Sequence, residues 1–315
     1  MILSASRRTD IPNYFSGWFF NRLEEGFLYV RNPVNVHQVS KIPLSPEIID
    51  AIVFWSKNPA PMIGSLDRLK GIPYYFQFTV TAYGRDIERN IPDKKQVILP
   101  VFQDLSGRIG SNRVIWRYDP IFFNNAYTKE YHLAAFGYIA ERLRGYTKKC
   151  IISFVDLYAK NRKNLEYLHC HMPGNEELTK FAGRLAELAH KNGMEIAACA
   201  ESMDLSCVGV AKSCCIDRKL LEEITGCRIL AEKDKNQRKE CGCAESIDIG
   251  CCNTCRNGCQ YCYAGYSTES ADRNCKNYHL DSPLLCSVLQ EGDRVTERKV
   301  ESLKEMQMGL DFFNI

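Results

Sequence analysis

Three cysteines near the carboxyl end of the chain have the spacing of an iron–sulfur ligand loop. Cys255, Cys259 and Cys262 are separated by three and by two residues, and Gly258 allows the chain between them to turn tightly. Thiolates are the usual protein ligands of 4Fe–4S clusters. Because three cysteines can hold only three of the four irons, one iron would stay open. We therefore expect a 4Fe–4S cluster with a free coordination position.

An open iron of this kind suits radical chemistry with S-adenosylmethionine (SAM). It can bind the amino and carboxylate groups of SAM and pass an electron to the sulfonium, and homolysis then yields a 5′-deoxyadenosyl radical that abstracts hydrogen from a substrate. The cofactor carries that chemistry and the protein positions it. A zinc knuckle that pairs Cys252 and Cys255 with Cys259 and Cys262 is the alternative. A ferredoxin loop is less favoured, because its four-cysteine run and following proline are absent.

The composition is that of a soluble, cytoplasmic protein rich in thiols. The 315 residues carry a formal net charge of +3, and no apolar run approaches the roughly 18 residues of a membrane span. The apolar stretch at the amino terminus is too short for a signal peptide. None of the 16 cysteines precedes Cys150, and 13 of them lie between Cys199 and Cys275. In a reducing cytosol, such clustering indicates metal binding rather than disulfides.

A second set of cysteines precedes the first. Cys199, the adjacent pair Cys214-Cys215, Cys241 and Cys243 together offer enough thiols for a fully ligated auxiliary 4Fe–4S cluster. Zinc ligands, or unliganded thiols packed as small apolar groups, are the competing interpretations.

The elements that must position these thiols alternate between strands and helices. Predicted strands are 2–5, 27–30, 51–55, 74–81, 113–118, 150–155, 194–199 and 246–250, and most are apolar on both faces. Helices are predicted from Pro12 to Gly26, from Ser45-Pro46-Glu47 onward, and over 133–143, 178–189 and 217–226, with one or two more in the final segment 282–314. We therefore predict a TIM-like (β/α) barrel, with a doubly wound open sheet as the competing fold. The barrel body would span residues 1–200, and residues 201–315 would complete and cap it.

Polar side chains follow most of the predicted strands. In β/α barrels the active site lies at the carboxyl ends of the strands, so these side chains would meet at one mouth. Its cations suit a substrate that carries carboxylate or phosphate groups. The candidates for binding substrate or SAM are Arg7, Arg8, Asp10, Asn32, Lys57, Asn58, Arg117, Asp119, Asp156 and Glu201.

Several segments also carry a family resemblance: 4–10, 54–59, 116–120, 152–156, 233–238, 241–243, 248–250 and 259–264. On these segments the chain resembles the domain-of-unknown-function 1848 family over nearly its whole length. The terminal cysteine cluster of that family is likened to the cluster of radical SAM enzymes, and Tyr261-Cys262-Tyr263 is similar to the spore-photoproduct-lyase branch. The family's Cys-Ile-Asp segment implies Cys215, rather than Cys214, as the fourth member of the auxiliary set.

The position of the loop departs from the radical SAM pattern, in which it follows the first barrel strand. If residues 246–250 form a strand beside residues 2–5, the loop would still leave a barrel strand at the correct face, as in a circular permutation. The first hypothesis is therefore a radical SAM enzyme that acts on a small anionic or nucleotide-like substrate and draws electrons from a donor such as ferredoxin or flavodoxin. The second is a non-catalytic iron–sulfur or zinc protein that binds nucleic acid or a protein partner through Lys233, Lys235, Arg238 and Lys239.

Overall fold

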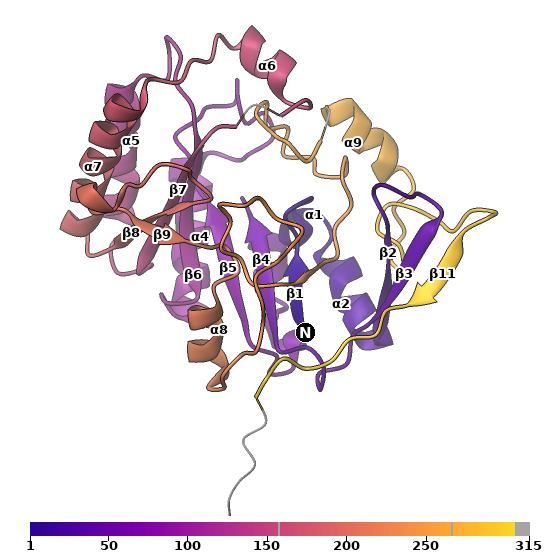
Figure 1. Cartoon of the computed structure of the whole chain (residues 1–315). Helices are drawn as coiled ribbons and strands as arrows, with labels where there is room; N and C mark the ends of the chain where they lie inside the picture. Colours follow the sequence, from indigo (N-terminus) through magenta and orange to yellow (C-terminus); the bar gives the residue numbers. More distant parts are fainter. Residues whose placement is uncertain (157, 266, 306–315) are drawn as a thin grey trace, which may run out of the picture.

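The main sheet is parallel throughout and has the order β10-β1-β4-β5-β6-β7-β8-β9 in the computed structural model, which describes residues 1–156, 158–265 and 267–305. All its strands run toward the same edge, at the top of Figure 1. The strands are β1 (Ile2–Ala5), β4 (Ala51–Ser56), β5 (Tyr74–Thr79), β6 (Val114–Ile121), β7 (Lys149–Phe154), β8 (Glu195–Cys199), β9 (Ala211–Ser213) and β10 (Ile247–Asp248). The α/β prediction is thereby confirmed.

One predicted strand does not belong to this sheet. Strand β2 (Phe27–Arg31) pairs antiparallel with β3 (Gln38–Pro43), and β11 (Arg294–Glu297) pairs with the other side of β3. The chain between β2 and β3, residues 32–37, is too short for the crossover that parallel strands need, which takes about a dozen residues or more. The two strands therefore pair antiparallel, as a hairpin. Asn32 instead starts the turn, where its side chain accepts a hydrogen bond from the Val34 backbone at 2.9 Å. The main sheet still has eight strands, because β9, which the sequence did not predict, pairs with β8 at one edge, while β1 pairs directly with β4.

The predicted pairing between residues 246–250 and the first strand is confirmed. Leu3 pairs with Ile247 and Ser4 with Asp248, in parallel register. Within the described residues, no hydrogen-bonded ladder joins the two edge strands β9 and β10 to each other. The space inside the curved sheet is filled by the chain between these strands, whose Ile216, Leu221 and Ile229 pack against inward-facing strand residues.

The helices are α1 (Ile11–Tyr14), α2 (Ser16–Glu25), α3 (Ala60–Ile63), α4 (Leu99–Ile109), α5 (Lys129–Arg142), α6 (Arg162–Tyr167), α7 (Asn175–Lys191), α8 (Arg218–Thr225) and α9 (Thr268–Cys275), with the short helical segments η1 (Leu66–Leu69), η2 (Lys94–Ile98) and η3 (Ser206–Val208). Helices α2, α4, α5 and α7 cover the outer face of the sheet. Helix α8 belongs to the chain that fills the inner side, where its Leu221 is buried, and α6 and α9 lie near the carboxyl-end edge of the sheet (Figure 1). Alternate strand residues point outward and stack on the helices or on each other. Phe54 lies 4.8 Å from Phe76, and Trp116 lies 4.7 Å from Phe136 of α5, between ring centroids.

Helix boundaries followed the sequence signals in most places. Gly26 ends α2 and Gly226 ends α8, each in the left-handed conformation that glycine adopts readily. Two predictions were wrong. Residues 45–47 lie in a turn rather than at a helix start, and residues 282–305 contain β11 and irregular chain rather than helices. The rest of the predicted helical segment, residues 306–314, lies outside the described residues. None of the helices in the described part of the chain has the length and apolar character needed to cross a bilayer.

The buried His132 of α5 gives a testable pH dependence of stability. Its Nδ1 accepts a hydrogen bond from the Tyr118 hydroxyl at 2.8 Å, and its Nε2 lies 3.0 Å from the Phe122 carbonyl. Burial lowers the pKa of His132 from 6.5 to about 4, so the folded state keeps the ring neutral where the unfolded chain protonates it. We expect the protein to lose about 3 kcal/mol of stability as the pH falls from 6.5 to 4.

Urea unfolding at several pH values measures this effect. The variant His132→Phe should be less stable at neutral pH, but its free energy of unfolding should fall less steeply between pH 6.5 and 4, because no imidazole is there to protonate. If the free energy of unfolding falls equally steeply with pH in both proteins, His132 is not the cause.

Candidate functional site

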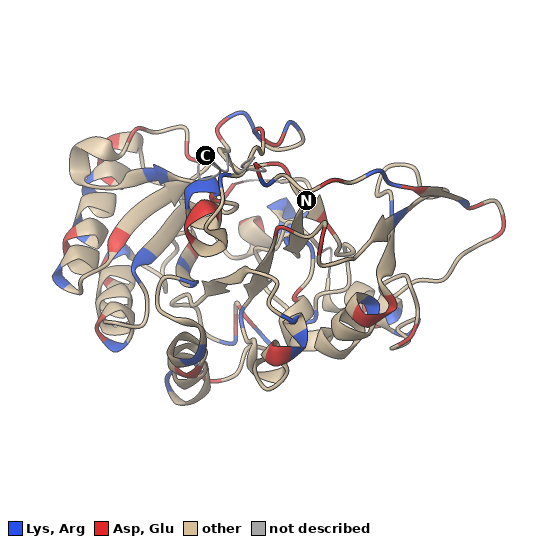
Figure 2. Cartoon of the chain, turned by 90° about the horizontal axis from the view of Figure 1, so that it is seen from below, with Lys and Arg blue, Asp and Glu red and all other residues tan. Residues whose placement is uncertain are grey.

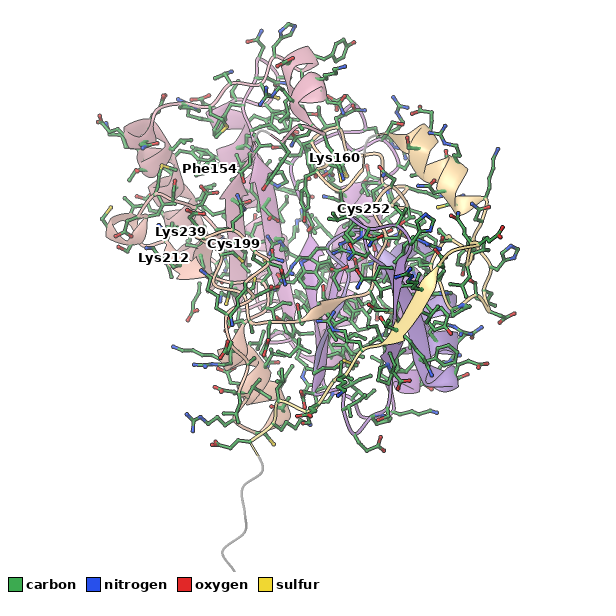
Figure 3. The ribbon with its side chains drawn as sticks, turned by 45° about the vertical axis from the view of Figure 1, so that its right-hand side comes forward. Phe154, Lys160, Cys199, Lys212, Lys239 and Cys252 are labelled. Atoms are coloured by element: carbon green, nitrogen blue, oxygen red, sulfur yellow. The ribbon has the colours of Figure 1, made fainter. Side chains whose placement is uncertain are left out.

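A cavity of about 420 Å³ lies at the carboxyl ends of the parallel strands, where open and closed α/β sheets generally bind ligands. Phe154 and Cys199, at the ends of β7 and β8, line it and are labelled in Figure 3. Both predicted cysteine sets contribute to its wall, as do seven of the ten predicted polar residues. The predicted residues that line it are Arg7, Arg8, Asp10, Lys57, Arg117, Asp119, Asp156, Cys199, Cys215, Cys241, Cys243, Cys255 and Cys262.

Three of the ten predicted polar residues lie outside this cavity. Asn32 is in the β2–β3 hairpin, because β2 is not a strand of the main sheet. The amide of Asn58 points to the Asn13 side chain at 3.3 Å. Glu201 accepts a hydrogen bond from the Phe154 backbone at 2.7 Å and supports the end of β7 from behind. These side chains therefore have structural contacts rather than positions on the cavity wall.

The three-cysteine loop, residues 255–262, is held over the cavity by the chain that follows β5. Gln260 donates its backbone N–H to the Ile87 carbonyl at 2.9 Å, and Asn90 donates to the Asn257 carbonyl at 3.2 Å. A bridge between Glu88 and Cys259 continues this contact. Because backbone groups on both sides are used, the loop conformation is fixed by its surroundings as well as by its own turn.

Side chains from two other elements complete the attachment. Asn161, just before α6, donates its amide to the Tyr261 carbonyl at 3.1 Å. Asn257 donates to a carboxylate oxygen of Asp10 at 3.0 Å, and the same oxygen accepts the Lys57 backbone N–H at 2.9 Å. The loop is thus tied to the ends of β1, β4 and β7 together.

A buried carboxylate, Glu88, lies beneath the loop. One of its oxygens accepts hydrogen bonds from Lys57 at 2.7 Å, from Thr81 at 2.8 Å and from the Tyr261 hydroxyl, and its other oxygen lies 2.6 Å from the Lys94 ammonium. Burial opposes the ionisation of Glu88, but the two lysines outweigh it and lower its pKa to about 2. The carboxylate is therefore charged and joins the loop to the sheet.

Sequence reasoning missed Glu88 because it assigned no polar residues to the end of the strand 74–81. The signal was present, since the run Arg85-Asp86-Ile87-Glu88-Arg89 directly follows that buried strand. Charged residues at this position of a parallel sheet belong to the same edge as the other candidates.

All three thiols of the loop face a second cavity of about 230 Å³. Burial raises the pKa of Cys255 and Cys262, and it raises that of Cys259 to about 12 against the opposing effect of the Lys57 ammonium. The three half-buried thiols share one cavity, and the Lys57 ammonium beside Cys259 favours its thiolate form against the effect of desolvation. The donors are therefore of the type that a thiolate-bound cluster requires, but among the described residues no three Cys, His, Asp or Glu side chains are arranged to hold a single metal ion.

The auxiliary set also comes together in space. The Cys199 and Cys215 sulfurs are 3.2 Å apart, and the Cys215 backbone donates to the Cys243 sulfur at 3.2 Å. Cys241 and Cys243 are hydrogen-bonded to each other, which lowers the pKa of Cys241 to about 7. Cys215 lines the cavity, and Cys214 is absent from its described lining. Among the described residues, no three Cys, His, Asp or Glu side chains surround one point closely enough for a single metal ion.

Two arginines accompany this set. Arg117 donates to the Cys215 sulfur at 2.9 Å and binds Asp119 through both ends of its guanidinium. Arg7 lies over the Trp55 ring at 5.2 Å, and its Nη2 is buried without a hydrogen-bond partner among the described residues. The two guanidinium groups favour the deprotonated thiols, but burial and the contacts between the thiols still leave the pKa of Cys199, Cys215 and Cys243 above its ordinary value.

Gly250 allows the chain to enter the three-cysteine segment close to β1. A Cβ at this position would lie 1.9 Å from the Ser6 hydroxyl oxygen, which itself donates to Asp248 at 2.8 Å. We expect Gly250→Ala to cost about 1–3 kcal/mol, because Ser6 must move and lose that contact. Chemical denaturation measures the change.

Gly107 is the matched control, because it lies within α4 and a Cβ there would meet no described atom within 4 Å. Gly107→Ala is expected to stabilise the protein by up to about 1 kcal/mol. Similar effects of the two alanines would contradict the close approach at Gly250.

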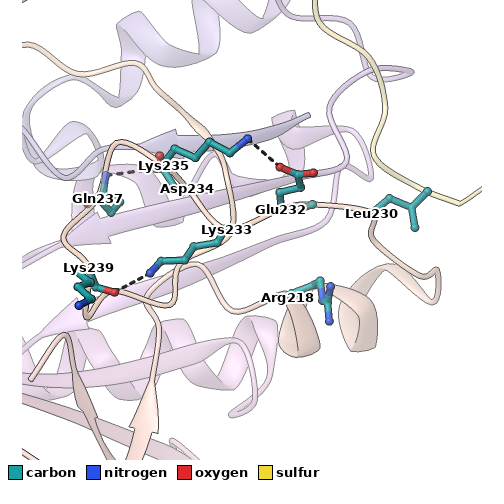
Figure 4. Close-up of a pocket in the computed structure, with 9 residues that line it drawn as sticks. Arg218, Leu230, Glu232, Lys233, Asp234, Lys235, Gln237 and Lys239 are labelled. Carbon is teal, nitrogen blue, oxygen red and sulfur yellow. Dashed lines mark hydrogen bonds and ion pairs between the residues drawn. The ribbon is translucent and has the colours of Figure 1, made fainter. Parts of the chain in front are cut away.

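A separate groove of about 860 Å³ is lined by the basic stretch predicted from the sequence. Figure 4 shows Lys235 paired with Glu232 and Lys233 directed to the Lys239 backbone, at 3.2 Å and 2.6 Å. In the view of Figure 2, cations and anions alternate over the helices and loops, and neither sign forms a continuous face. The groove is thus only locally basic.

Comparison with curated proteins and with solved structures finds no match. A family model, described as a domain of unknown function, matches residues 2–264 and so includes both cysteine sets and the whole main sheet. The chain therefore belongs to the family described as domain of unknown function 1848.

Proposed function

We propose that this chain is a radical SAM enzyme whose open 4Fe–4S cluster is held by Cys255, Cys259 and Cys262. The observation that supports this most is the pairing of β10 with β1. Because of that pairing, the loop leaves a strand of the parallel sheet at its carboxyl end and opens into the cavity lined by the strand-end cations. This is where an α/β fold positions ligands.

We infer further that the fold is a barrel, circularly permuted relative to radical SAM barrels. In those enzymes the loop follows the first strand, and here it follows β10, the neighbour of β1. The segment between β9 and β10 packs inside the sheet and would take over the role of direct hydrogen bonds between the two edges.

When bound, the cluster would supply the electron that cleaves SAM and generates a 5′-deoxyadenosyl radical. The protein's own groups would then bind and orient the reactants. The carboxylates of Asp10, Asp119 and Asp156 are already engaged by protein donors. Arg7 keeps an unused, buried donor beside an aromatic ring. A substrate with a carboxylate or phosphate next to an aromatic base matches this pair.

The auxiliary set would hold a second 4Fe–4S cluster through Cys199, Cys215, Cys241 and Cys243. Arg117 and Arg7 would offset its negative charge. Both clusters need a reductant, for which a ferredoxin or flavodoxin is suited, and a reducing compartment such as the cytoplasm. The auxiliary cluster, the reductant and the reducing compartment all follow only if the protein binds iron.

Anaerobic reconstitution tests the proposal. The full chain is loaded with iron and sulfide, desalted, and assayed for iron, sulfide and zinc. It is then reduced with dithionite and given SAM, and 5′-deoxyadenosine is quantified. We expect iron and sulfide in equal amounts and production of 5′-deoxyadenosine. Zinc without iron, or iron without SAM cleavage, would overturn the enzyme assignment.

The groove of Figure 4 favours a second candidate, a metal-binding protein that contacts nucleic acid through Lys233, Lys235 and Lys239. The fourth predicted contact, Arg238, instead lines the cavity at the strand ends and pairs with Asp156. That function predicts binding of duplex or single-stranded nucleic acid that weakens steeply with salt, because each phosphate contact releases counterions. Titration of labelled oligonucleotides at two salt concentrations separates the candidates. Lys233→Glu should abolish such binding and leave SAM cleavage unchanged.

A further inference from the structure

Cys275 and Cys286 are two buried thiols in contact with each other, outside both cysteine sets. The Cys286 thiol donates to the Cys275 sulfur at 3.8 Å. Cys275 is the last residue of α9, and Cys286 lies in the irregular chain before β11 (Figure 1). Their exposed fractions are 8% and 5%. Both lie beyond residues 2–264, the part of the chain that the family model covers.

We propose that Cys275 and Cys286 form a redox-active dithiol, which a low-molecular-weight peroxide converts into a disulfide. The Cys275 thiolate attacks the peroxide, the O–O bond breaks, and Cys275 becomes a sulfenic acid while hydroxide or alkoxide leaves. The Cys286 thiol then attacks the sulfenic sulfur, the S–S bond forms, and water leaves. The dithiol is oxidised by two electrons and the peroxide is reduced by two.

The geometry suits this pair of steps. A disulfide has an S–S bond of about 2.05 Å, so the two sulfurs must approach by roughly 2 Å, which rotation of one side chain can supply. Cys286 has a backbone φ of +51°, a conformation that non-glycine residues adopt rarely and that is often found at functional positions. In this conformation the Cys286 thiol reaches the Cys275 sulfur.

The two thiols are also differentiated electrostatically. The hydrogen bond from Cys286 lowers the pKa of Cys275 against the effect of burial, and the Arg256 guanidinium adds to the lowering. The same contact raises the pKa of Cys286. Cys275 therefore has the character of the attacking thiol and Cys286 that of the resolving thiol.

Oxidation would act on the support of the three-cysteine loop. The Cys275 thiol donates to the carbonyl of Thr254, the residue before Cys255, at 3.3 Å, and this hydrogen bond is lost when Cys275 ionises. The ring closed by the disulfide would include Tyr278 and Ser282, which pack against α2. The bond would thus tie α9 and the start of the loop to α2. The chemistry of the pair itself uses neither cysteine set, so the inference is independent of the proposed function.

Peptide mapping tests the proposal. The full chain is reduced, freed of reductant without air, treated with stoichiometric hydrogen peroxide, denatured in N-ethylmaleimide and digested with trypsin. Trypsin separates residues 274–276 from residues 277–294, and each peptide holds one cysteine. We expect these two peptides to be recovered as a disulfide-linked pair that dithiothreitol separates.

Variants identify the roles of the two thiols. Cys286→Ser should abolish the linked pair and leave Cys275 as a sulfenic acid that reacts with dimedone. Cys227→Ser is the control, and it should give the same linked pair as the wild type. The proposal is overturned if both thiols are still alkylated after peroxide, or if either is linked to another cysteine. It is equally overturned if a chelator is needed before the reduced thiols react, since they would then be metal ligands.

Discussion

Replacing Glu88 with glutamine is expected to destabilise the protein by about 3–5 kcal/mol, because it leaves buried lysines without their counter-ion. Glu88 is 1% exposed, and the side chains of Lys57 and Lys94 are 13% and 18% exposed. Glutamine keeps one acceptor oxygen, replaces the other with an NH2 donor and carries no charge. Urea unfolding at neutral pH measures the loss, because the carboxylate is ionised there and both lysines depend on it.

Two variants show whether charge or packing is responsible. Tyr261→Phe removes one hydrogen bond to Glu88 and keeps the ring, so about 1 kcal/mol should be lost. Arg108→Ala removes an exposed partner of Asp104, and a change under about 0.5 kcal/mol is expected. If Glu88→Gln lowers the free energy of unfolding by no more than Tyr261→Phe does, the ion pairs of Glu88 with Lys57 and Lys94 do not contribute the expected stability.

Loosening of the three-cysteine loop should accompany the loss in Glu88→Gln. The Tyr261 hydroxyl and the bridge to Cys259 both depend on this residue. Alkylation of Cys259 by iodoacetamide under native conditions should therefore be faster than in the wild type. The exposed Cys207 serves as the internal reference, since its rate should not change.

The parallel strands could be predicted because their residues are apolar on both faces. Residues 51–55 and 150–155 have this character and became β4 and β7. Phe27–Arg31 looks the same in sequence, but the turn at Asn32 is too short for a crossover, so it became part of a hairpin. Strand β9 has only three residues and is exposed along much of its length, so no apolar pattern marks it.

The site residues that follow the ends of predicted strands could be predicted from the sequence. Contacts between segments that are far apart in the sequence could not. Arg7, Lys57 and Arg117 follow or end buried strands, and all three line the cavity. The contact of Tyr261 with Glu88 joins residues 173 positions apart. No spacing rule relates them, because the contact is made by tertiary packing between the loop after β10 and the chain after β5. The pairing of β10 with β1 was itself foreseen from the need to bring the loop to the correct edge.

The largest functional effects are expected from single cysteine substitutions that separate the two proposed clusters. Cys259→Ser should lower the iron content from about eight to about four atoms per chain and abolish formation of 5′-deoxyadenosine, because the SAM-binding cluster needs all three thiolates. Cys215→Ser should lower the iron content by a similar amount through the auxiliary set. It should leave detectable cleavage of SAM, since the three-cysteine loop keeps its contacts.

Cys214→Ser is the matched control for Cys215→Ser, because the two residues are adjacent but only Cys215 contacts the Cys199 sulfur. Cys214 packs near Gly242 and should be replaceable without loss of iron. If Cys214→Ser and Cys215→Ser lose equal amounts of iron, Cys215 is not the specific ligand, and the assignment of the auxiliary set is wrong. If Cys259→Ser keeps its full iron content, Cys259 is not a cluster ligand, and the proposed SAM-binding cluster is wrong.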